Sequence, residues 1–370
     1  MASKIDSRLK LATVLLVLLL TAQLGACAIV AEEQQSNPSS PSATEEIQEV
    51  TASVTAPTVA TDTPAPTPAM TTETATATAR PSPTPTATPT LTPPPAATAT
   101  PETVEFAVIG DYGLAGEGEA AVAALIDSWE PDFIITVGDN NYPDGEAETI
   151  DANIGQYYAG YIHPYQGQYT TTVSTENVST EGVNRFFPTL GNHDFYNPDG
   201  AGPYLDYFTL PGNERYYDFV WGAVHLFALN SDFSEPDGIN AGSVQAQWLQ
   251  EQLAASTAPW QLVYFHVAPY ASGLHGSGDW MRWPFEVWGA DVVLSGHNHH
   301  YERLLVGGIP YFVNGLGGGA IYAVGETLPE TQTSFSGVHG AMRVAATTET
   351  LTFEFITRHG EIVDQYTLSK

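Results

Sequence analysis

Apolar runs that end in short polar loops recur along the chain from residue 104 onward. The segments 104–113, 131–142 and 185–194 each contain a run of branched or aromatic residues that leads into a glycine followed by Asp or Asn. The segments 260–270 and 290–303 have similar apolar runs that lead into histidines. Short apolar runs bounded in this way are typical of buried β-strands. We therefore predict five buried strands, each of which delivers a polar loop.

Helical spacing of apolar residues predicts helices at 117–129 and 243–256, the second with Ser243 as its N-cap. The segment 216–232 indicates two strands around Trp221 and Gly222, and 342–368 indicates a β-meander. Several strands follow one another without an intervening helix, which argues against a purely parallel sheet. We expect an α/β fold in which two stacked mixed β-sheets are flanked by helices.

Ligands of α/β proteins bind beyond the carboxyl ends of the strands, so the polar loops should meet at one site. Carboxylate and amide oxygens suit hard cations, and imidazole suits Zn, Fe, Mn and Ni. Two ions that share one carboxylate would use all the donors, and a pair about 3.5–4 Å apart can clamp a phosphoryl group during displacement. The candidate metal ligands, in chain order, are Asp111, Asp139, Tyr142, Asn192, His266, His297 and His299.

The loop motifs are similar, in order, to those of a known enzyme family. "GDYG", "GDNNY", "GNHD", "VYFH" and "GHNH" resemble the five motifs of the purple acid phosphatases, which belong to the calcineurin-like metallophosphoesterases. "GHNHHYER" resembles that family's GHxHxYER closely. Each motif alone is common, but five in sequence, each after an apolar strand, are specific. The resemblance covers most of 104–370 and implies a four-layer αββα sandwich.

The resemblance also implies a ligand set for two metal ions. Asp111, Tyr142 and His299 would hold the first ion, which is Fe(III) in the family, and Asp139 would bridge to the second. The second ion, Fe(II), Zn or Mn, would be held by Asn192, His266 and His297. A phenol has a pKa near 10, so Tyr142 becomes a ligand only beside a strongly charged ion. The alternative is a packed aromatic residue next to a zinc or manganese pair.

Three further residues are candidates for catalysis. In the family, the histidine that matches His193 binds phosphate and protonates the leaving group, and the neighbouring Asp194 could hold its tautomer. His275 lies nine residues after His266, a spacing that resembles the second active-site histidine of the small, mammalian-type members. The alternatives are a supporting role for His193 and a surface position for His275.

The implied function is the hydrolysis of small phosphate monoesters. Alternatives are a phosphodiesterase or nucleotidase of the same superfamily, a non-catalytic surface binding module, and an oxidative activity of a redox-active iron pair. Selectivity should come from the loop 143–184 or from "WMRWPFEVW" at 280–288, although ordinary packing is the favoured reading of that aromatic segment.

The remaining histidines and Arg303 receive structural roles. If residues 297–299 are extended, His297 and His299 face the same way and His300 faces the opposite way, so His300 should not be a ligand. His225 lies mid-strand and should belong to the core or the sheet surface. Arg303 could face phosphate or form an ion pair with Glu302 or another carboxylate.

Charge and the N-terminal sequence suggest where the protein acts. The formal net charge is −31, which argues against nucleic acid as a ligand because phosphate chains are bound by Lys and Arg. Three basic residues and the apolar stretch 11–21 resemble an export signal, since that stretch is too short for an ordinary membrane span.

"LGAC" at 24–27 resembles a bacterial lipobox that ends at Cys27, the only cysteine, so no intrachain disulfide can form. A plain signal peptide is the alternative. Residues 28–103, rich in Thr, Pro and Ala, are expected to be a disordered tether, because they lack the apolar side chains that offset ordering entropy. We thus expect a signal peptide at 1–27, a tether at 28–103 and a catalytic domain at 104–370. The domain would be extracytoplasmic, held through lipid on Cys27 at the cell membrane or outer membrane of a bacterium.

Overall fold

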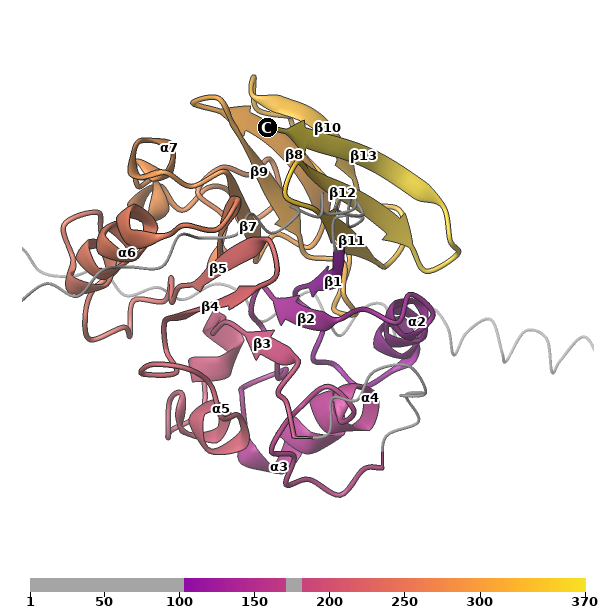
Figure 1. The fold of residues 1–370 in the computed structure, drawn as a ribbon. Helices are drawn as coiled ribbons and strands as arrows, with labels where there is room; N and C mark the ends of the chain where they lie inside the picture. The colour runs from indigo at the N-terminus through magenta and orange to yellow at the C-terminus, as the bar shows by residue number, and fades with distance from the viewer. Residues whose placement is uncertain (1–102, 171–181) are drawn as a thin grey trace, which may run out of the picture. The chain divides into compact units, whose positions relative to one another are not determined.

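The computed structural model describes residues 103–170 and 182–370 (Figure 1). The predicted signal peptide, the predicted tether up to residue 102, and residues 171–181 of the loop 143–184 lie outside the described residues. Among the helices of the two described stretches, none has both the length and the apolar character that crossing a membrane requires.

The first sheet has six strands in the order β13-β12-β11-β1-β2-β3. Strands β1, β2 and β3 pair in parallel, whereas β11 runs antiparallel to β1 and continues through β12 and β13 as the predicted meander. The strand bounds are β1 Val104–Ile109, β2 Phe133–Thr136, β3 Phe186–Pro188, β11 Gly340–Ala346, β12 Thr350–Thr357 and β13 Ile362–Ser369.

The second sheet has seven strands in the order β10-β8-β9-β7-β6-β5-β4. Its central strands β5, β6, β7 and β9 are parallel, and antiparallel neighbours flank them on both sides. The strand bounds are β4 Tyr217–Trp221, β5 Val224–Ala228, β6 Trp260–Val267, β7 Val292–Gly296, β8 Tyr301–Val306, β9 Ile309–Asn314 and β10 Thr331–Phe335. The expected pair of mixed sheets is therefore confirmed.

The segment 290–303 differs from its prediction. It forms two strands, because β7 ends at Gly296 and β8 begins at Tyr301, with the histidines in the turn between them. His297 has φ +67°, so the backbone there is left-handed and not extended. The alternation of side chains that an extended segment 297–299 would have is therefore absent.

Helices flank the sheets (Figure 1). Figure 1 shows α2 to α5 gathered around β1–β3, while α6 and α7 lie beside the second sheet. The Ser243 side chain accepts a hydrogen bond of 3.1 Å from Ala246 N at the start of α6, which confirms the N-cap. The bounds are α2 Glu117–Asp127, α3 Ala147–Ile150, α4 Gln156–Tyr158, α5 Gly202–Tyr207, α6 Val244–Ala255 and α7 Phe285–Trp288, with a π-helix at Asp151–Gly155 and 3₁₀-helices at Asn192–Phe195 and Asp279–Met281.

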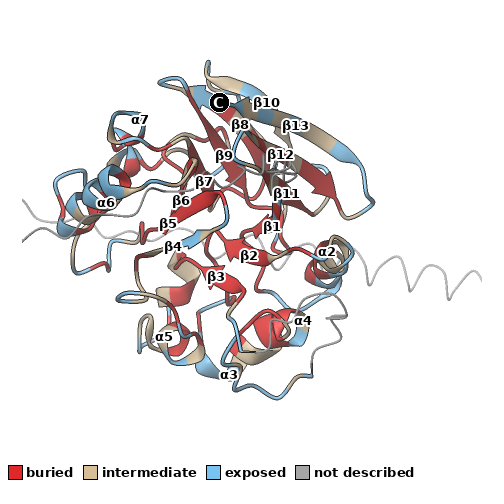
Figure 2. Cartoon of the chain, viewed as in Figure 1, coloured by how far each residue is buried: buried red, intermediate tan, exposed pale blue. Residues whose placement is uncertain are grey.

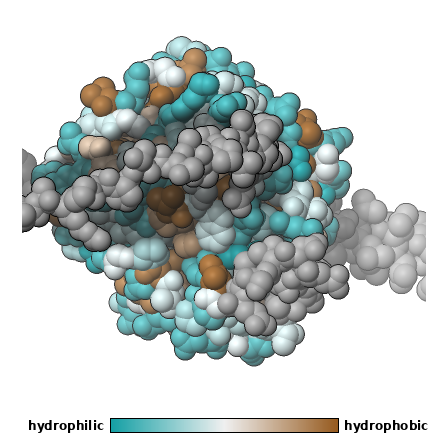
Figure 3. All heavy atoms as spheres, in the orientation of Figure 1, coloured by the Kyte–Doolittle hydropathy of each residue, from teal (hydrophilic) through white to brown (hydrophobic). Residues whose placement is uncertain are grey.

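The two sheets pack face to face over a shared apolar core (Figure 2). Phe312 of the second sheet contacts Phe353 of the first with ring centroids 4.8 Å apart. A second cluster lies between the second sheet and α6 and α7, and it includes Met281, Trp283 and Phe285. The aromatic segment 280–288 therefore contributes mainly to packing. Hydrophilic residues dominate the face drawn in Figure 3, where hydrophobic residues form separate patches.

Candidate metal centre

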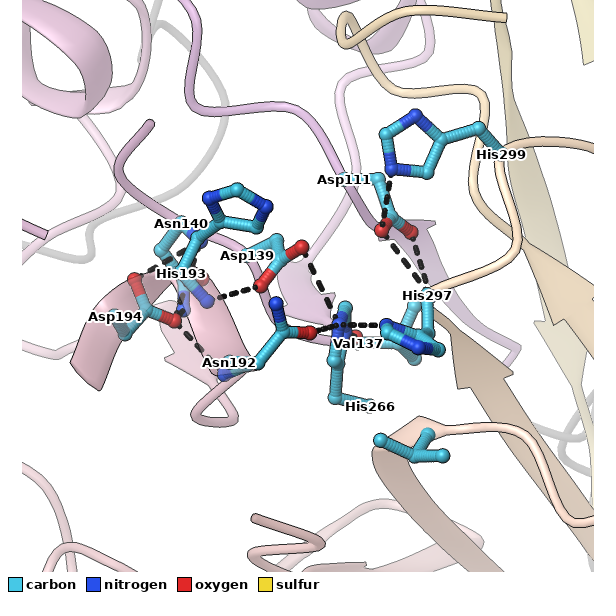
Figure 4. A network of polar contacts seen from close by, with 12 residues as sticks. Asp111, Val137, Asp139, Asn140, Asn192, His193, Asp194, His266, His297 and His299 are labelled. Carbon is cyan, nitrogen blue, oxygen red and sulfur yellow. Dashed lines mark hydrogen bonds and ion pairs between the residues drawn. The ribbon is translucent and has the colours of Figure 1, made fainter. Parts of the chain in front are cut away.

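The predicted ligands come from loops or strand ends on both sheets and meet at one place, as Figure 4 shows for all of them except Tyr142, which contacts Asp139 and His299. Asp111 and Asp139 follow β1 and β2, and Asn192 follows β3 in the first sheet. In the second sheet, His266 lies near the end of β6, and His297 and His299 follow β7. Because the carboxyl ends of these strands point to the same edge, side chains far apart in the sequence become neighbours.

Asp111, Asp139, Tyr142 and His299 form one group of donors. One potential ligand atom from each of Asp111, Asp139 and His299 lies within 4.8 Å of the other two. The Tyr142 hydroxyl donates to Asp139 Oδ2 at 2.9 Å and lies 3.2 Å from His299 Nε2. His299 Nε2 lies 3.3 Å from Asp111 Oδ1. The three residues expected at the first ion are thus in contact, with Asp139 beside them.

A second group of donors surrounds His266. Its Nε2 atom lies 3.0 Å from Asn192 Oδ1, 3.2 Å from His297 Nδ1 and 3.3 Å from Asp139 Oδ2. Asp139 Oδ2 therefore faces both groups, since the same oxygen accepts from Tyr142. A carboxylate expected to bridge two cations would need this position.

The surroundings of the two groups fit cations. Asp111 and Asp139 are 0% and 1% exposed, and two buried carboxylates this close need positive charge beside them. His266 Nδ1 lies 2.8 Å from the Val137 carbonyl oxygen, and His299 Nδ1 contacts the Ala320 carbonyl oxygen. Each carbonyl accepts the ring N–H and turns the Nε2 lone pair toward the other donors, as in known metal sites.

The pKa values show how these charges interact. Burial by itself would lower the pKa of His266, but the adjacent Asp139 carboxylate raises it to about 10. Burial raises the pKa of Asp139, yet the charge and hydrogen bond of His266 and those of His193 together outweigh burial and hold that pKa below its usual range. Burial and the His266 charge lower the pKa of His297 to about 3. A proton on His266 thus compensates Asp139 and would compete with a cation for the same Nε2 atom.

The backbone around the donors is constrained. Asp111, Asp139 and His297 have φ values of 55°, 54° and 67°, a left-handed conformation that costs side-chain-bearing residues free energy and that clusters at functional sites. The motif glycines make room for ligands of other motifs. A Cβ atom at Gly191 would lie 2.2 Å from Asp139 Oδ1, and one at Gly296 would lie 2.6 Å from Asp111 Oδ2. These two glycines are needed because a carboxylate occupies the space of a side chain.

His193 lies beside the first donor group. Its backbone N–H donates to Asp139 Oδ1 at 3.0 Å, and its ring packs on Tyr142 with centroids 4.3 Å apart. The ring Nδ1 atom contacts the carbonyl oxygen of Pro143. Pro143 thereby holds the ring in the way that was expected of Asp194.

Asp194 has a different set of partners. Its carboxylate accepts hydrogen bonds from Gly191 N at 2.8 Å and from Asn140 N and Nδ2 at 3.1 Å and 2.8 Å. Its hydrogen bonds within the described residues do not include the His193 ring, so the expected contact is corrected. Burial and the nearby Asp139 raise the pKa of Asp194 to about 7. Asp194 therefore joins the loop of β2 to the turn after β3 and positions both.

His275 reaches the same site from the second sheet. Its ring centroid lies 4.6 Å from that of His297 and 6.0 Å from that of His299. Its backbone N–H donates to Asn298 Oδ1 at 3.0 Å, and Asn298 Nδ2 donates to the Gly276 carbonyl oxygen at 2.9 Å. Asn298 is fully buried and fastens the loop that carries His275 to the turn after β7.

His300 and Arg303 point away from the donors. His300 is 1% exposed, and its Nε2 atom lies 2.9 Å from Glu302 Oε2. Arg303 donates to both oxygens of Asp364, at 2.7 Å and 3.1 Å, so its partner is not Glu302. His225 lies between Asp218 and Ser256, 2.8 Å and 2.9 Å away. These three residues have the structural roles that the sequence indicated.

A cavity of about 380 Å³ opens beside the two donor groups. His193, His275 and Gly319 line it together with several metal-ligand candidates, and Gly319 ends a glycine-rich loop, "VNGLGGG", at 313–319. Pro143 belongs to the loop 143–184 from which selectivity was expected, whereas four other lining residues were not predicted, namely Leu114, Tyr196, Ala320 and Tyr322. No periodicity singles them out, although each lies within five residues of a motif or of the glycine-rich loop.

Comparisons with known proteins agree with the motifs. A family model described as "Calcineurin-like phosphoesterase" matches residues 104–301. Purple acid phosphatase 22 of Arabidopsis thaliana is 32% identical over 213 residues, which cover 54% of this chain and 45% of that protein. Tartrate-resistant acid phosphatase type 5 of Mus musculus is 24% identical over 261 residues, which cover 60% of this chain and 74% of that protein. The chain spans about half the length of the plant relatives that it matches.

Solved structures share the fold. The purple acid phosphatase PPD1 from yellow lupin seeds superposes with a TM-score of 0.58 at 16% identity, over 73% of this chain and 54% of that one. GAP50, the anchor in the inner membrane complex of Plasmodium, superposes with a TM-score of 0.55 at 16% identity, over 72% of this chain and 89% of that one. The family match, the ordered motifs and the sandwich of two mixed sheets lead to one conclusion: the chain belongs to the calcineurin-like phosphoesterase family and resembles its purple acid phosphatases.

Proposed function

We propose that this protein is a binuclear metal phosphatase that hydrolyses phosphate monoesters. The observation that carries the proposal is the meeting of two donor groups at Asp139 Oδ2, beside a cavity that His193 and His275 line. The first group offers a phenol, a carboxylate and an imidazole, and the second offers an amide and two imidazoles. Such a set suits one hard and one borderline cation.

Asp111, Tyr142 and His299 would hold the first ion, Asn192, His266 and His297 the second, and Asp139 would bridge them. When bound, a metal pair polarises the phosphoryl group and makes a water nucleophilic near neutral pH. Burial and the Asp139 and Asp111 carboxylates raise the pKa of Tyr142, so a phenolate at this position requires a strongly charged cation. We therefore assign Fe(III) to the first position and Fe(II), Zn or Mn to the second.

His193 and His275 would supply the proton that the departing alkoxide needs. The Pro143 carbonyl oxygen accepts a hydrogen bond from His193 Nδ1–H, which leaves Nε2 as the atom that exchanges a proton with substrate. The hydrogen bond from His193 N to Asp139 Oδ1 holds this residue against the donor groups. His275 lies between His266 and His297 in the sequence and reaches the cavity through a loop that Asn298 holds.

Metal analysis and a visible spectrum test the ligand assignment. We expect an absorption band near the middle of the visible range in the iron-loaded protein, and its loss in Tyr142→Phe with the iron retained. A colourless wild-type protein that contains stoichiometric iron would contradict a Tyr142 phenolate ligand.

Paired substrates test the reaction. The loaded protein should hydrolyse 4-nitrophenyl phosphate faster than bis(4-nitrophenyl) phosphate. The reverse order would identify a phosphodiesterase. Hydrolysis of neither ester with both ions bound would support a non-catalytic binding module, and oxidation of a dye without phosphate release would support the oxidative alternative.

We also propose that the protein is exported and lipid-anchored through Cys27. The support is the order of a basic start, an apolar stretch at 11–21 and "LGAC" at 24–27. Lipid chains hold a protein at a membrane by burying about 0.8 kcal/mol per CH₂ group. Mass spectrometry of the mature N-terminus should find an acylated Cys27, and Cys27→Ser should move the protein from the detergent phase to the aqueous phase. An unmodified mature N-terminus at another residue would refute the anchor.

A further inference from the structure

The cavity beside the metal centre has two chemically different parts. Its inner part carries the donor side chains and the two histidines, whereas its rim is formed by Leu114, Pro143, Tyr196 and Tyr322. Leu114 and Tyr196 are 46% and 58% exposed, so their apolar surfaces face the space that a ligand would enter. An apolar wall around a few polar groups is typical of a site for a small organic molecule.

Both tyrosines of the rim pack against residues of the candidate metal centre. The Tyr196 ring meets the His193 ring edge-on, with centroids 4.8 Å apart, and its hydroxyl accepts a 2.7 Å hydrogen bond from Asn192 Nδ2. Tyr322 stacks on His299 with centroids 4.5 Å apart and an interplanar angle of 15°. Because these contacts already restrict the rings, an organic group that packs on them loses little further side-chain entropy.

The described lining of this cavity lacks the side chains that carry a permanent positive charge. It contains no lysine or arginine, and the basic residues of the described part pair with other groups. Arg185 donates to the backbone carbonyls of Pro131, Asp132 and Gly160. The others form ion pairs with acidic residues, namely Arg215, Arg282, Arg303, Arg343, Arg358 and Lys370. A phosphate beyond the metal ions would thus meet no unpaired lysine or arginine of the described residues, in a protein of formal net charge −31.

We propose that the site selects esters with a single phosphoryl group on an uncharged, flat, apolar alcohol, and that Tyr196 and Leu114 determine this selectivity. The proposal rests on the phosphatase function proposed above. The metal pair compensates the charge of one phosphoryl group, and the organic part packs on the aromatic and aliphatic rim. In esters with several phosphates, each additional phosphate loses its hydration without gaining a compensating contact, so these esters are poor substrates.

Two alkyl esters test the rim without changing the leaving group much. Benzyl phosphate and ethyl phosphate both release a basic alkoxide, so their ratio of kcat/KM reports contacts with the organic part. For the metal-loaded full chain we expect benzyl phosphate to be preferred by about tenfold, mainly through KM, since rim contacts exist before and during reaction. Phytate and pyrophosphate should be hydrolysed more slowly than ethyl phosphate.

Variants assign the preference to named residues. Tyr196→Ala and Leu114→Ala should each lower the benzyl-to-ethyl ratio severalfold, whereas Tyr196→Phe, which loses only the hydroxyl bound to Asn192, should keep it. Phe233→Ala is the matched control, because Phe233 is 74% exposed and does not line the cavity. Calorimetry with benzylphosphonate and ethylphosphonate gives the same comparison for binding alone, without turnover.

The outcomes separate the two proposals. Hydrolysis with a benzyl-to-ethyl ratio near one, a ratio that Tyr196→Ala and Leu114→Ala leave unchanged, or a preference for phytate overturns the selectivity but leaves the phosphatase function standing. If neither ester is hydrolysed by protein that carries both ions, the phosphatase function fails and the selectivity fails with it. A tenfold ratio that both alanine variants reduce, together with a matching preference in phosphonate binding, supports the proposal.

Discussion

Replacing Glu302 by alanine should destabilise the protein by about 3–5 kcal/mol. The Glu302 side chain is fully buried and accepts hydrogen bonds from Ser272 N at 2.8 Å, from Ser272 Oγ at 2.6 Å and from Thr331 Oγ1. His300 Nε2 lies 2.9 Å from Glu302 Oε2, the oxygen that also accepts from Ser272 N. The carboxylate thus joins β8 to the loop before His275 and to β10.

The magnitude follows from the groups that alanine leaves unpaired. Ser272 N–H and the His300 ring N–H would lose their buried acceptor, and each such loss costs about 1–3 kcal/mol. The hydroxyls of Ser272 and Thr331 lie 3.4 Å apart and can turn toward each other, so they add less. An unfilled space where the side chain was adds to the cost.

Urea unfolding of the metal-loaded protein measures this loss of free energy. Glu354→Ala is the control, since Glu354 pairs with Arg343, whose side chain is 37% exposed, and such a pair contributes below about 1 kcal/mol. Equal small losses in the two variants would refute the assigned role of the Glu302 network.

Acidification gives a second test of the same network. Burial raises the pKa of Glu302, but the hydrogen bonds from His300, Ser272 and Thr331 outweigh burial and lower it below the usual 4.5. A depressed folded-state pKa contributes stability above the unfolded pKa that is lost as the pH falls through the folded pKa. The difference between wild type and Glu302→Ala should therefore shrink below about pH 4.5. A difference that grows on acidification would contradict this sign.

Three further substitutions test other parts of the structure. His193→Ala should lower kcat for ethyl phosphate by about 10²–10⁴ and lower it less for 4-nitrophenyl phosphate, whose leaving group needs no proton; equal losses would argue against proton donation. Asn298→Ala should lower kcat/KM through the loop of His275, so adding it to His275→Ala should cause little further loss, and full additivity would show that Asn298 acts elsewhere. Ser243→Ala should lower the free energy of unfolding in urea by about 1 kcal/mol, because α6 loses its N-cap. An unchanged urea midpoint would show that the Ser243 side chain does not stabilise α6.

Local patterns in the sequence predicted most of the elements that carry the site. The apolar runs at 104–113, 131–142 and 260–270 correspond to β1, β2 and β6, and the meander at 342–368 corresponds to β11 to β13. Strands β9 and β10 received no prediction. The correct predictions share a cause, because a buried strand or helix face requires apolar residues at regular spacing in the sequence.

The sequence by itself determined which side chains could bind metal, because ligand chemistry depends on residue type and each donor follows an apolar strand. Only the tertiary structure decided their neighbours. Pro143, and not Asp194, holds the His193 ring. Tyr196 forms the rim of the cavity, and the turn at 297–300 directs His300 to Glu302. Such contacts depend on how strand ends from two sheets meet, and that meeting is set by packing between segments far apart in the chain.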